Sequence, residues 1–493
     1  MSKQHNAHVI TEPTPQMRCA IAVIGSGPGG AITACLLAEA GRDVLLIEDG
    51  DYLPLDSCAP FSIAEMTQKY RNGGLTPTMG NPKVQYAEGR CVGGGSEVNS
   101  GLYYRTPPHV LAQWRDEFGV DALTEADLLP YFEACERDVN VCLMPGQLPA
   151  ASLKLHEGAT QLGWESHEVP RWFKYDTPDS STAPPKGKRQ SMTETFIPRF
   201  LQAGGKLLPR TRVTRIRQTG RQWQLKAQNQ REQRLRSIQI QAETVFVAGG
   251  AVQTPALLRR SGIRHNIGNA LQLHPTIKVI TQFPEQVNAA EMGVPVHQVK
   301  EFSPRYSFGC SISSLPYLAL GINDHPRYLP EVEQHWQQMA IYYAMVTGEG
   351  HGTVRCLPGY RDPLVRYHLT DGDMRTLTES LHKLCELLFA AGATTLYPSV
   401  MQRQPLRSLT DLAQWPEQIS RQHSNLMTIH LFSSCPMGEN PKRCATDSFG
   451  QVRGFDNLYI ADASLLCTAP GVNPQGSIMA IARRNALKFL GRL

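Results

Sequence analysis

The chain has 493 residues, which is enough for a large buried core and for two or three domains. Its composition is ordinary for a globular protein, and its net charge of +5 comes without a long basic block. The densest basic cluster, from Arg210 to Arg236, alternates loosely with apolar residues. We interpret it as the solvated faces of strands and not as a nucleic-acid-binding surface.

The cysteines and the N-terminal segment bear on the compartment of the protein. Its twelve cysteines are scattered singly and lack metal-ligand spacing, so we expect reduced, mostly buried thiols and no metal site. Residues 1–15 are expected to form a flexible lead-in, and they lack the apolar core of a signal peptide. Because no apolar run is long enough to span a bilayer, we expect a cytoplasmic protein without a transmembrane segment.

The segment from Ile21 to Glu48 contains the strongest motif of the chain. Its apolar runs and glycines predict a strand, a glycine-rich turn, a helix and a second strand, at residues 21–24, 25–30, 31–40 and 43–47. This order is typical of a dinucleotide-binding unit, in which the acid after the second strand contacts a ribose.

Each glycine of the G-x-G-x-x-G turn has its own expected task. Gly25 allows the tight turn, Gly27 lets the backbone approach a pyrophosphate, and Gly30 lets the helix pack closely against the strand. The N–H groups of the helix start would face the phosphates, and Glu48 would accept hydrogen bonds from a ribose diol. The motif alone does not separate FAD from NAD, and a glycine-rich turn without a ligand is the simpler alternative.

A second glycine-rich segment follows at residues 89–101, with the sequence GRCVGGGSEVNSG. Three consecutive glycines do not suit the interior of a helix or strand, and the apolar Val92 and Val98 do not suit a flexible linker. We therefore expect a loop that contacts a ligand. The region 146–190, rich in proline, glycine and charge, is either a loop over an active site or a long surface excursion.

The middle of the chain indicates two kinds of sheet. Short strands between residues 206 and 247 end in the turn A-G-G-A at 248–251, which leads into a helix. Residues 277–368 alternate strand-like runs with loops, as in an antiparallel sheet. An apolar stripe over residues 374–388 predicts a core helix with a capping box at its start.

The last third contains the candidate catalytic groups. His430 precedes the segment L-F-S-S-C-P-M-G, and a short buried strand ends at Asp462, where an acid points into the usual ligand crevice. The segment GVNPQG at 471–476 then opens a helix, with Asn473 as its expected N-cap and Pro474 at its first position. The positive end of that helix would lie near the site.

Together these segments resemble the glucose–methanol–choline (GMC) oxidoreductases over nearly the full length of the chain. Five signatures match in order: the GSGPGG turn with Glu48, GRCVGGGSEVNSG at 89–101, AGGAVQTPALLRRSGI at 248–263, the segment from His430 to Gly438, and ADAS at 461–464 followed by GVNP at 471–474. The V-G-G-G-S form of the second signature is nearer to the cholesterol oxidase and fatty alcohol oxidase branches than to the sugar oxidases.

The resemblance implies an α/β FAD-binding domain with a Rossmann-like parallel sheet. This domain is expected to be interleaved with an α+β substrate domain built on an antiparallel sheet. The FAD-binding domain would comprise residues 16–145, 186–276 and 425–493, and the substrate-binding domain residues 146–185 and 277–424.

The resemblance also implies the cofactor contacts. The three glycines of the first turn would lie on the pyrophosphate and Glu48 on the adenosine ribose, while Val213 would hold the adenine through its backbone. The later motifs contribute further cofactor-binding residues: Arg90, Gly93, Gly94, Ser96, Asn99, Ala248, Asp462, Asn473, Pro474 and Gln475. Family members with covalent flavin carry a histidine just before the motif's asparagine, and Val98 stands there, so we expect noncovalent FAD.

The family's catalytic pair, a histidine with a histidine or asparagine, falls on His430 and Asn473. An imidazole titrates near neutral pH, so His430 suits a general base for the hydroxyl proton while hydride passes to flavin N5. Asn473 would hold the substrate oxygen. Because the two serines at 433–434 replace the family's usual Gly-Thr, His423 is the reserve candidate, and His274 is interpreted as structural.

The predicted function is the oxidation of a CH–OH group of an alcohol by FAD, with oxygen or another acceptor reoxidising the flavin. The aromatic residues Trp172, Phe173 and Tyr175 fit an apolar alcohol. Two alternatives stay open. One is a non-redox flavin enzyme of the same family, such as a lyase or a photodecarboxylase, and the other is a flavin-binding protein without catalysis.

Overall fold

The computed structural model describes residues 8–176, 187–231, 234–290 and 292–492. Of the expected lead-in over residues 1–15, residues 1–7 lie outside this part of the chain, as do residues 177–186 of the 146–190 region. Val9 pairs with Leu207, and Ile10 donates a backbone hydrogen bond to the Leu207 carbonyl. The chain is therefore attached to the fold from Val9 onward.

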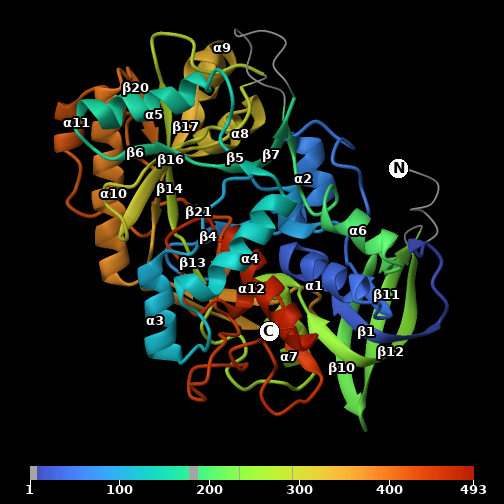
Figure 1. Cartoon of the computed structure of the whole chain (residues 1–493). Helices are drawn as coiled ribbons and strands as arrows, with labels where there is room; N and C mark the ends of the chain where they lie inside the picture. The colour runs from blue at the N-terminus through green and yellow to red at the C-terminus, as the bar shows by residue number, and fades with distance from the viewer. Residues whose placement is uncertain (1–7, 177–186, 232–233, 291, 493) are drawn as a thin grey trace.

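The first sheet contains the segment from Ile21 to Glu48 and appears at the lower right of Figure 1. Its strand order is β10-β11-β12-β1-β2-β9, and β23 also pairs with β12. The strands are β1 (Gln16–Ile24), β2 (Val44–Ile47), β9 (Lys206–Leu208), β10 (Thr211–Thr219), β11 (Gln222–Arg231), β12 (Arg234–Val247) and β23 (Leu458–Ile460). Because β9, β2, β1, β12 and β23 run parallel, their carboxyl ends meet at one edge, where ligands bind in open α/β sheets.

Helix α1 (Pro28–Glu39) follows β1 directly, as the sequence predicts. It packs between α6 (Phe196–Gln202) and α12 (Gln475–Phe489), near the centre of Figure 1. Every residue from Gly29 to Ala38 is buried, so α1 has no polar face. The helix is thereby held with its N-terminus at the carboxyl end of β1.

The second sheet has the strand order β3-β4-β21-β14-β17-β16-β15-β6, with β20 also paired to β14. Its strands are β3 (Thr76–Pro77), β4 (Val84–Tyr86), β6 (Ser166–Glu168), β14 (Thr276–Gln282), β15 (His297–Val299), β16 (Tyr306–Cys310), β17 (Met339–Val346), β20 (Thr395–Pro398) and β21 (Leu426–Thr428). Within the described part of this second sheet, β4–β21 is the only parallel strand pair. The antiparallel sheet predicted from the middle of the chain is thus present, and it also takes β4 and β21 from segments assigned to the FAD-binding domain.

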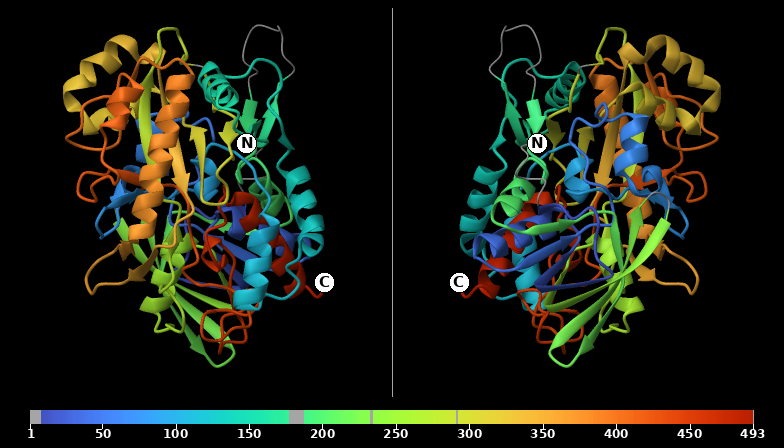
Figure 2. Two further views of the ribbon diagram at one scale, coloured as in Figure 1. Left: turned by 90° about the vertical axis from the view of Figure 1, so that its left-hand side faces the viewer. Right: turned by 90° about the vertical axis from the view of Figure 1, so that its right-hand side faces the viewer.

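Helix α10 (Asp371–Ala390) covers this sheet and packs on β14, β16 and β17 (Figure 2). Its start is the predicted capping box, in which Asp373 N donates to Thr370 Oγ1 at 3.0 Å and Thr370 N donates to Asp373 Oδ2 at 2.8 Å. The apolar stripe from Met374 to Leu388 is buried, which confirms its assignment to the core.

The remaining α-helices and three small sheets complete the fold. The other helices are α2 (Ile63–Lys69), α3 (Pro108–Phe118), α4 (Glu125–Asp138), α5 (Ala150–Gln161), α7 (Gly250–Arg260), α8 (Leu315–Gly321), α9 (Leu329–His335) and α11 (Leu409–Ala413). Three small sheets pair β5 (Val141–Cys142) and β8 (Gly187–Arg189) with β7 (Arg171–Tyr175), β13 (Gln272–Leu273) with β22 (Leu431–Phe432), and β18 (His351–Arg355) with β19 (Leu364–His368).

The pair β13–β22 matters most for the site. Leu273 lies opposite Leu431 in this antiparallel pair, so the residues just outside it, His274 and His430, become neighbours. They are 156 residues apart in the sequence.

All twelve cysteines lie in the described residues as free thiols, and all but Cys58, Cys142 and Cys356 are buried. Within the same residues, no group of three or more His, Cys, Asp or Glu side chains is placed to hold a metal ion. None of the described helices has the length and apolar character needed to cross a membrane.

Candidate functional site

A cleft of about 1710 Å³, counted with its open mouth, joins the two glycine-rich segments to the C-terminal third of the chain. Its lining extends from the turn at Gly25 to His430 and Asn473. Twelve predicted site residues line it: Gly25, Gly27, Glu48, Gly94, Asn99, Val213, Ala248, His430, Asp462, Asn473, Pro474 and Gln475. The other four, which lie outside the lining, are Gly30, Arg90, Gly93 and Ser96.

The three glycines of the first turn have three different environments. A Cβ at Gly25 would lie 2.2 Å from the Ala248 carbonyl oxygen, and one at Gly30 would lie 2.0 Å from the Gly25 carbonyl oxygen. Both positions therefore exclude any side chain. A Cβ at Gly27 would meet no described atom within 4 Å apart from its chain neighbours, so it would project into the cleft. The first N–H groups of α1 have no partner within the helix, which makes this opening suited to an anion.

Glu48 follows β2 and is tied to this turn. Its Oε2 accepts hydrogen bonds from Ser26 N at 3.0 Å and from Ser26 Oγ at 2.7 Å, and its Oε1 accepts from Gly50 N at 2.9 Å. Burial raises the pKa of Glu48, whereas the hydrogen bonds from Gly50 and Ser26 oppose that shift. The carboxylate is fixed at the cleft wall, where Oε1 keeps a lone pair for a further donor.

The second glycine segment packs on the first. A Cβ at Gly94 would lie 2.8 Å from the Gly27 Cα, so only glycine permits the two backbones to approach this closely. Gly93 adopts φ +95° and donates its N–H to Ser26 Oγ at 3.1 Å, while Ser96 Oγ donates to the Gly93 carbonyl at 2.8 Å. Gly93 and Ser96 thus support the cleft wall from behind it.

Asp462, at the end of β23, holds the A-G-G-A turn in place. Its Oδ2 accepts from Gly250 N at 2.8 Å, and its Oδ1 accepts from Ser464 N at 2.8 Å. Burial raises the pKa of Asp462, and hydrogen bonds from Ser464, Thr254 and Gly250 oppose the shift. The acid lies at the carboxyl end of a parallel strand, as predicted.

The start of α12 differs by one residue from the prediction. Pro474 is the N-cap and Gln475 the first helical residue, whereas Asn473 was expected at the N-cap. Asn473 cannot cap because its amide is directed to Gln298 and the cleft. Gln475 Oε1 instead accepts a hydrogen bond from Asn99 Nδ2 at 2.7 Å, which joins the helix start to the second glycine segment.

His430 and Asn473 come together at the cleft. Asn473 Nδ2 lies 3.4 Å from His430 Nε2, and Asn473 Oδ1 accepts a hydrogen bond from Gln298 Nε2 at 3.3 Å. His430 Nδ1 lies 3.1 Å from His274 Nδ1, whose ring Nε2 accepts from Gly471 N at 3.1 Å. Sequence reasoning missed Gln298. It treated His274 as structural, because the contact between His274 and His430 depends on strand register.

Burial controls the charge of this pair. It lowers the pKa of His430 to about 4, with a smaller contribution from the positive charge of Lys300. Burial, His430 and Lys300 together hold the pKa of His274 well below its ordinary value. Both rings are therefore neutral at pH 7.

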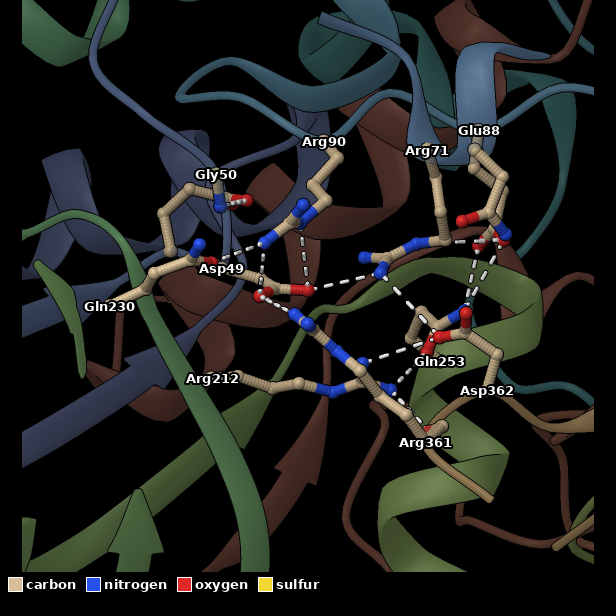
Figure 3. Close-up of polar contacts among 12 residues, drawn as sticks. Asp49, Gly50, Arg71, Glu88, Arg90, Arg212, Gln230, Gln253, Arg361 and Asp362 are labelled. Carbon is tan, nitrogen blue, oxygen red and sulfur yellow. Dashed lines mark hydrogen bonds and ion pairs between the residues drawn. The ribbon is translucent and has the colours of Figure 1, made fainter. Parts of the chain in front are cut away.

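A charged cluster lies along the cleft beyond Glu48 (Figure 3). Three arginines surround the carboxylate of Asp49. Arg71 Nη1 donates to Asp49 Oδ2 at 3.0 Å. Arg90 Nε and Arg361 Nη2 lie 3.4 and 3.5 Å from the carboxylate oxygens. Burial raises the pKa of Asp49, but Arg71, Arg90 and Arg212 outweigh it and lower the pKa below its ordinary value. Asp49 is therefore ionised at neutral pH.

Arg212 connects this cluster to the loop between β18 and β19. Its Nη1 donates to Asp362 Oδ1 at 3.2 Å, and its Nη2 donates to the Arg361 carbonyl at 2.8 Å and to Gln253 Oε1 at 3.3 Å. Arg212 is buried and lines the cleft, which corrects its interpretation as part of a solvated face. Sequence pattern could not show this, because the partners come from distant segments.

Two further expectations are corrected. Trp172 and Phe173 are buried in the core and do not line the described cleft, and the Arg171 guanidinium stacks 4.0 Å from the Phe173 ring centre. His423 also lies outside the lining, and its carbonyl accepts a hydrogen bond from Met401 N. His430 is therefore the candidate catalytic histidine.

Comparisons with known proteins agree with this arrangement. GMC oxidoreductase family models match residues 66–276 and 350–482, and a model of the NAD(P)-binding Rossmann-like domain matches residues 23–55. An uncharacterised GMC-type oxidoreductase of Sinorhizobium fredii is 39% identical over 96% of this chain and 94% of its own length. A long-chain-alcohol oxidase of Arabidopsis thaliana is 27% identical over 97% of this chain and 69% of its own length.

Solved structures share the fold. Pyridoxine 4-oxidase from Mesorbium loti has a TM-score of 0.72 at 18% identity, over 96% of this chain and 99% of that one. A formate oxidase from Aspergillus oryzae, whose FAD modification was studied, has a TM-score of 0.71 at 14% identity, over 96% and 98% of the two chains. The chain belongs to the GMC oxidoreductase family, and its expected α/β fold with a Rossmann-like sheet is confirmed.

Proposed function

We propose that this protein is an FAD-dependent oxidoreductase that oxidises the CH–OH group of an alcohol. One observation carries the proposal: a continuous cleft leads from the opening at Gly27 to the polar pair His430 and Asn473. Membership of the GMC oxidoreductases supports the redox class, and the long-chain-alcohol oxidase among the relatives supports an alcohol as substrate.

The residues present fit FAD. The open position at Gly27 and the N-terminus of α1 suit a pyrophosphate, and Glu48 with the backbone of Val213 would hold the adenosine. The flavin would lie against Gly94 and Asn99. Val98 lines the cleft with a side chain that cannot bond to a flavin, so we propose noncovalent binding.

The protein's own side chains would hold the alcohol and exclude water from the cleft. FAD, when bound, would supply the hydride acceptor at its N5 atom. His430 Nε2 and Asn473 Nδ2 would hold the alcohol oxygen between them, because they lie 3.4 Å apart and both residues face the cleft. The apolar side chains of Val98, Leu102 and Ile429, which also line the cleft, would contact the carbon chain and exclude water.

An anaerobic absorption spectrum tests the function. Purified protein is first saturated with FAD, and primary and secondary alcohols of increasing chain length are then added one at a time. The proposal predicts that at least one alcohol class bleaches the visible flavin absorption. A flavin that dithionite bleaches but no alcohol does would refute alcohol oxidation, and admission of air afterwards separates an oxidase from a dehydrogenase.

A further inference from the structure

Two chains of hydrogen bonds end at the same point of the cleft. One reaches His430 from the backbone of Gly471, and the other reaches Asn473 from Tyr104. Their last atoms, His430 Nε2 and Asn473 Nδ2, are 3.4 Å apart, so one oxygen atom can contact both. The direction of each chain decides whether these atoms donate or accept.

The first chain fixes the proton of His430. Gly471 N–H can only donate, so His274 Nε2 must accept, and a neutral His274 then carries its proton on Nδ1. That proton points at His430 Nδ1, 3.1 Å away, which must accept in turn. A neutral His430 consequently carries its own proton on Nε2, the atom that faces Asn473 and the cleft.

The second chain fixes the amide of Asn473. Tyr104 donates its one hydroxyl proton to Gln298 Oε1 at 3.0 Å and accepts from His167 Nε2 at 2.9 Å, so the Gln298 amide nitrogen points the other way. This nitrogen donates to Tyr343 Oη at 3.2 Å and to Asn473 Oδ1 at 3.3 Å. With its oxygen engaged behind the cleft wall, Asn473 presents an Nδ2 donor to the cleft. Because His430 Nε2 also carries a proton, neither nitrogen accepts from the other, and an oxygen atom between them would accept from both.

We propose that His274 and Gln298 are positioning residues that hold two N–H donors, on His430 and Asn473, at one point as a cradle for the substrate oxygen. This inference rests on the proposed function for its substrate but not for its hydrogen-bond directions. It gives His430 a proton at Nε2 in the substrate-free enzyme, whereas a general base would need a lone pair there.

The charges around the pair agree with such a cradle. The positive charge that acts on His430 is that of Lys300, and the neighbouring ring of His274 is neutral. Lys300 Nζ is buried, has no hydrogen-bond partner within the described residues, and lies 4.8 Å from the ring centre of Tyr104. Burial lowers the pKa of Lys300 to about 8, so the amine stays mostly charged at pH 7. One positive charge and two N–H donors favour an oxygen that carries negative charge.

The chemical consequence is a defined path for the hydroxyl proton. In the cradle, the O–H bond of the alcohol breaks with its electron pair left on oxygen, and the proton passes to a water molecule. The alkoxide is held by His430 Nε2–H and Asn473 Nδ2–H. The donors lower the pKa of the bound alcohol because they stabilise its ionised form.

Histidine tautomers can be measured directly. The full-length, FAD-loaded protein is labelled with ¹⁵N-histidine, and long-range ¹H–¹⁵N correlations are recorded at pH 7 without substrate. Signals are assigned with the variants His430→Gln and His274→Asn. We expect His430 protonated only at Nε2 and His274 only at Nδ1. A His430 protonated at Nδ1, or at both nitrogens, overturns the proposal whatever the substrate proves to be.

Kinetics of flavin bleaching test the positioning role. Asparagine at 274 can place its Nδ2 donor near the lost ring Nδ1, whereas leucine cannot donate. We therefore expect His274→Leu to slow bleaching at least about tenfold and His274→Asn to restore most of the rate, with His423→Asn as the control. Gln298→Leu tests the other chain in the same way. Equal rates for the Asn and Leu variants at 274 would contradict the role of His274.

The pH profile gives a further readout. If water takes the proton from a cradled alcohol, more of the alcohol is ionised as the pH rises, so the wild-type bleaching rate rises between pH 6 and 8, below the pKa of about 8 at which Lys300 loses its charge. If His430 with its pKa of about 4 is the base, the rate is flat over that range. A flat profile therefore overturns the cradle. If no alcohol bleaches the flavin at all, the proposed function fails, while the tautomer measurement still decides the hydrogen-bond directions.

Discussion

The substitution Gly27→Ala separates cofactor binding from folding. Gly27 has φ −63°, which alanine adopts without strain, and a Cβ there would meet no described atom within 4 Å beyond its chain neighbours. We expect the free energy of unfolding without FAD to change by less than about 1 kcal/mol. The new methyl group would instead occupy the opening that we assign to the pyrophosphate.

The size of the effect follows from the hydrogen bonds lost. A methyl group displaces the phosphate from the N–H groups of α1, and one charge-assisted hydrogen bond is worth about 1.5–3 kcal/mol. Since about 1.4 kcal/mol corresponds to a tenfold change in Kd, FAD affinity should fall roughly 10- to 100-fold.

The assay is a titration of apoprotein with FAD, followed by quenching of flavin fluorescence, with thermal unfolding of the apoprotein in parallel. Gly30→Ala is the matched control, because its Cβ would lie 2.0 Å from the Gly25 carbonyl oxygen and must disturb the backbone. It should lower Tm, unlike Gly27→Ala. Unchanged FAD affinity in a folded Gly27→Ala protein would refute the placement of the pyrophosphate.

Three other substitutions test separate parts of the structure. His430→Gln should retain FAD but slow alcohol-dependent bleaching about 100-fold or more, whereas His423→Gln should leave the bleaching rate unchanged. Equal stopped-flow rates for these two variants would contradict this. Asp49→Asn should destabilise the fold by about 2 kcal/mol at pH 7, because it removes the nearest carboxylate from Arg71, whose other partners Glu88 and Asp362 lie at 3.8 and 3.9 Å. The folded-state pKa of Asp49 is lowered, so this stabilisation is present above about pH 4 and is lost as the pH falls through the folded pKa; denaturant unfolding should show the difference shrinking below pH 4. Thr370→Ala should cost about 1 kcal/mol in the same unfolding assay and leave FAD affinity unchanged.

Local patterns predicted much of the fold because local sterics determine them. Gly25 and Gly30 leave no room for a side chain, so their spacing alone indicates the turn and the close helix packing. Helix α10 was equally predictable, since a capping box and an apolar stripe of helical period define its start and its buried face.

Contacts between distant segments were not predictable. His274 meets His430 only because Leu273 pairs with Leu431, and one sequence carries no signal for that register. Arg212 is a second example. It is buried where it pairs with Asp362, which comes from a loop distant in the sequence.

The shift of the α12 start has a different cause. The sequence rule for N-caps assumes a free asparagine side chain, whereas the Asn473 amide is held by Gln298. A residue at a functional site can thus depart from the local rule because another contact competes for it.

The central claim is that an alcohol gives up its carbinol hydrogen in the cleft beside His430 and Asn473. Stopped-flow absorbance under anaerobic conditions tests it most directly, with an active alcohol compared to the same alcohol deuterated at the carbinol carbon. The account predicts that deuteration slows flavin bleaching several-fold in the wild type and that His430→Gln slows both reactions. Bleaching that is equally fast with both alcohols, and unaffected by His430→Gln, would contradict it.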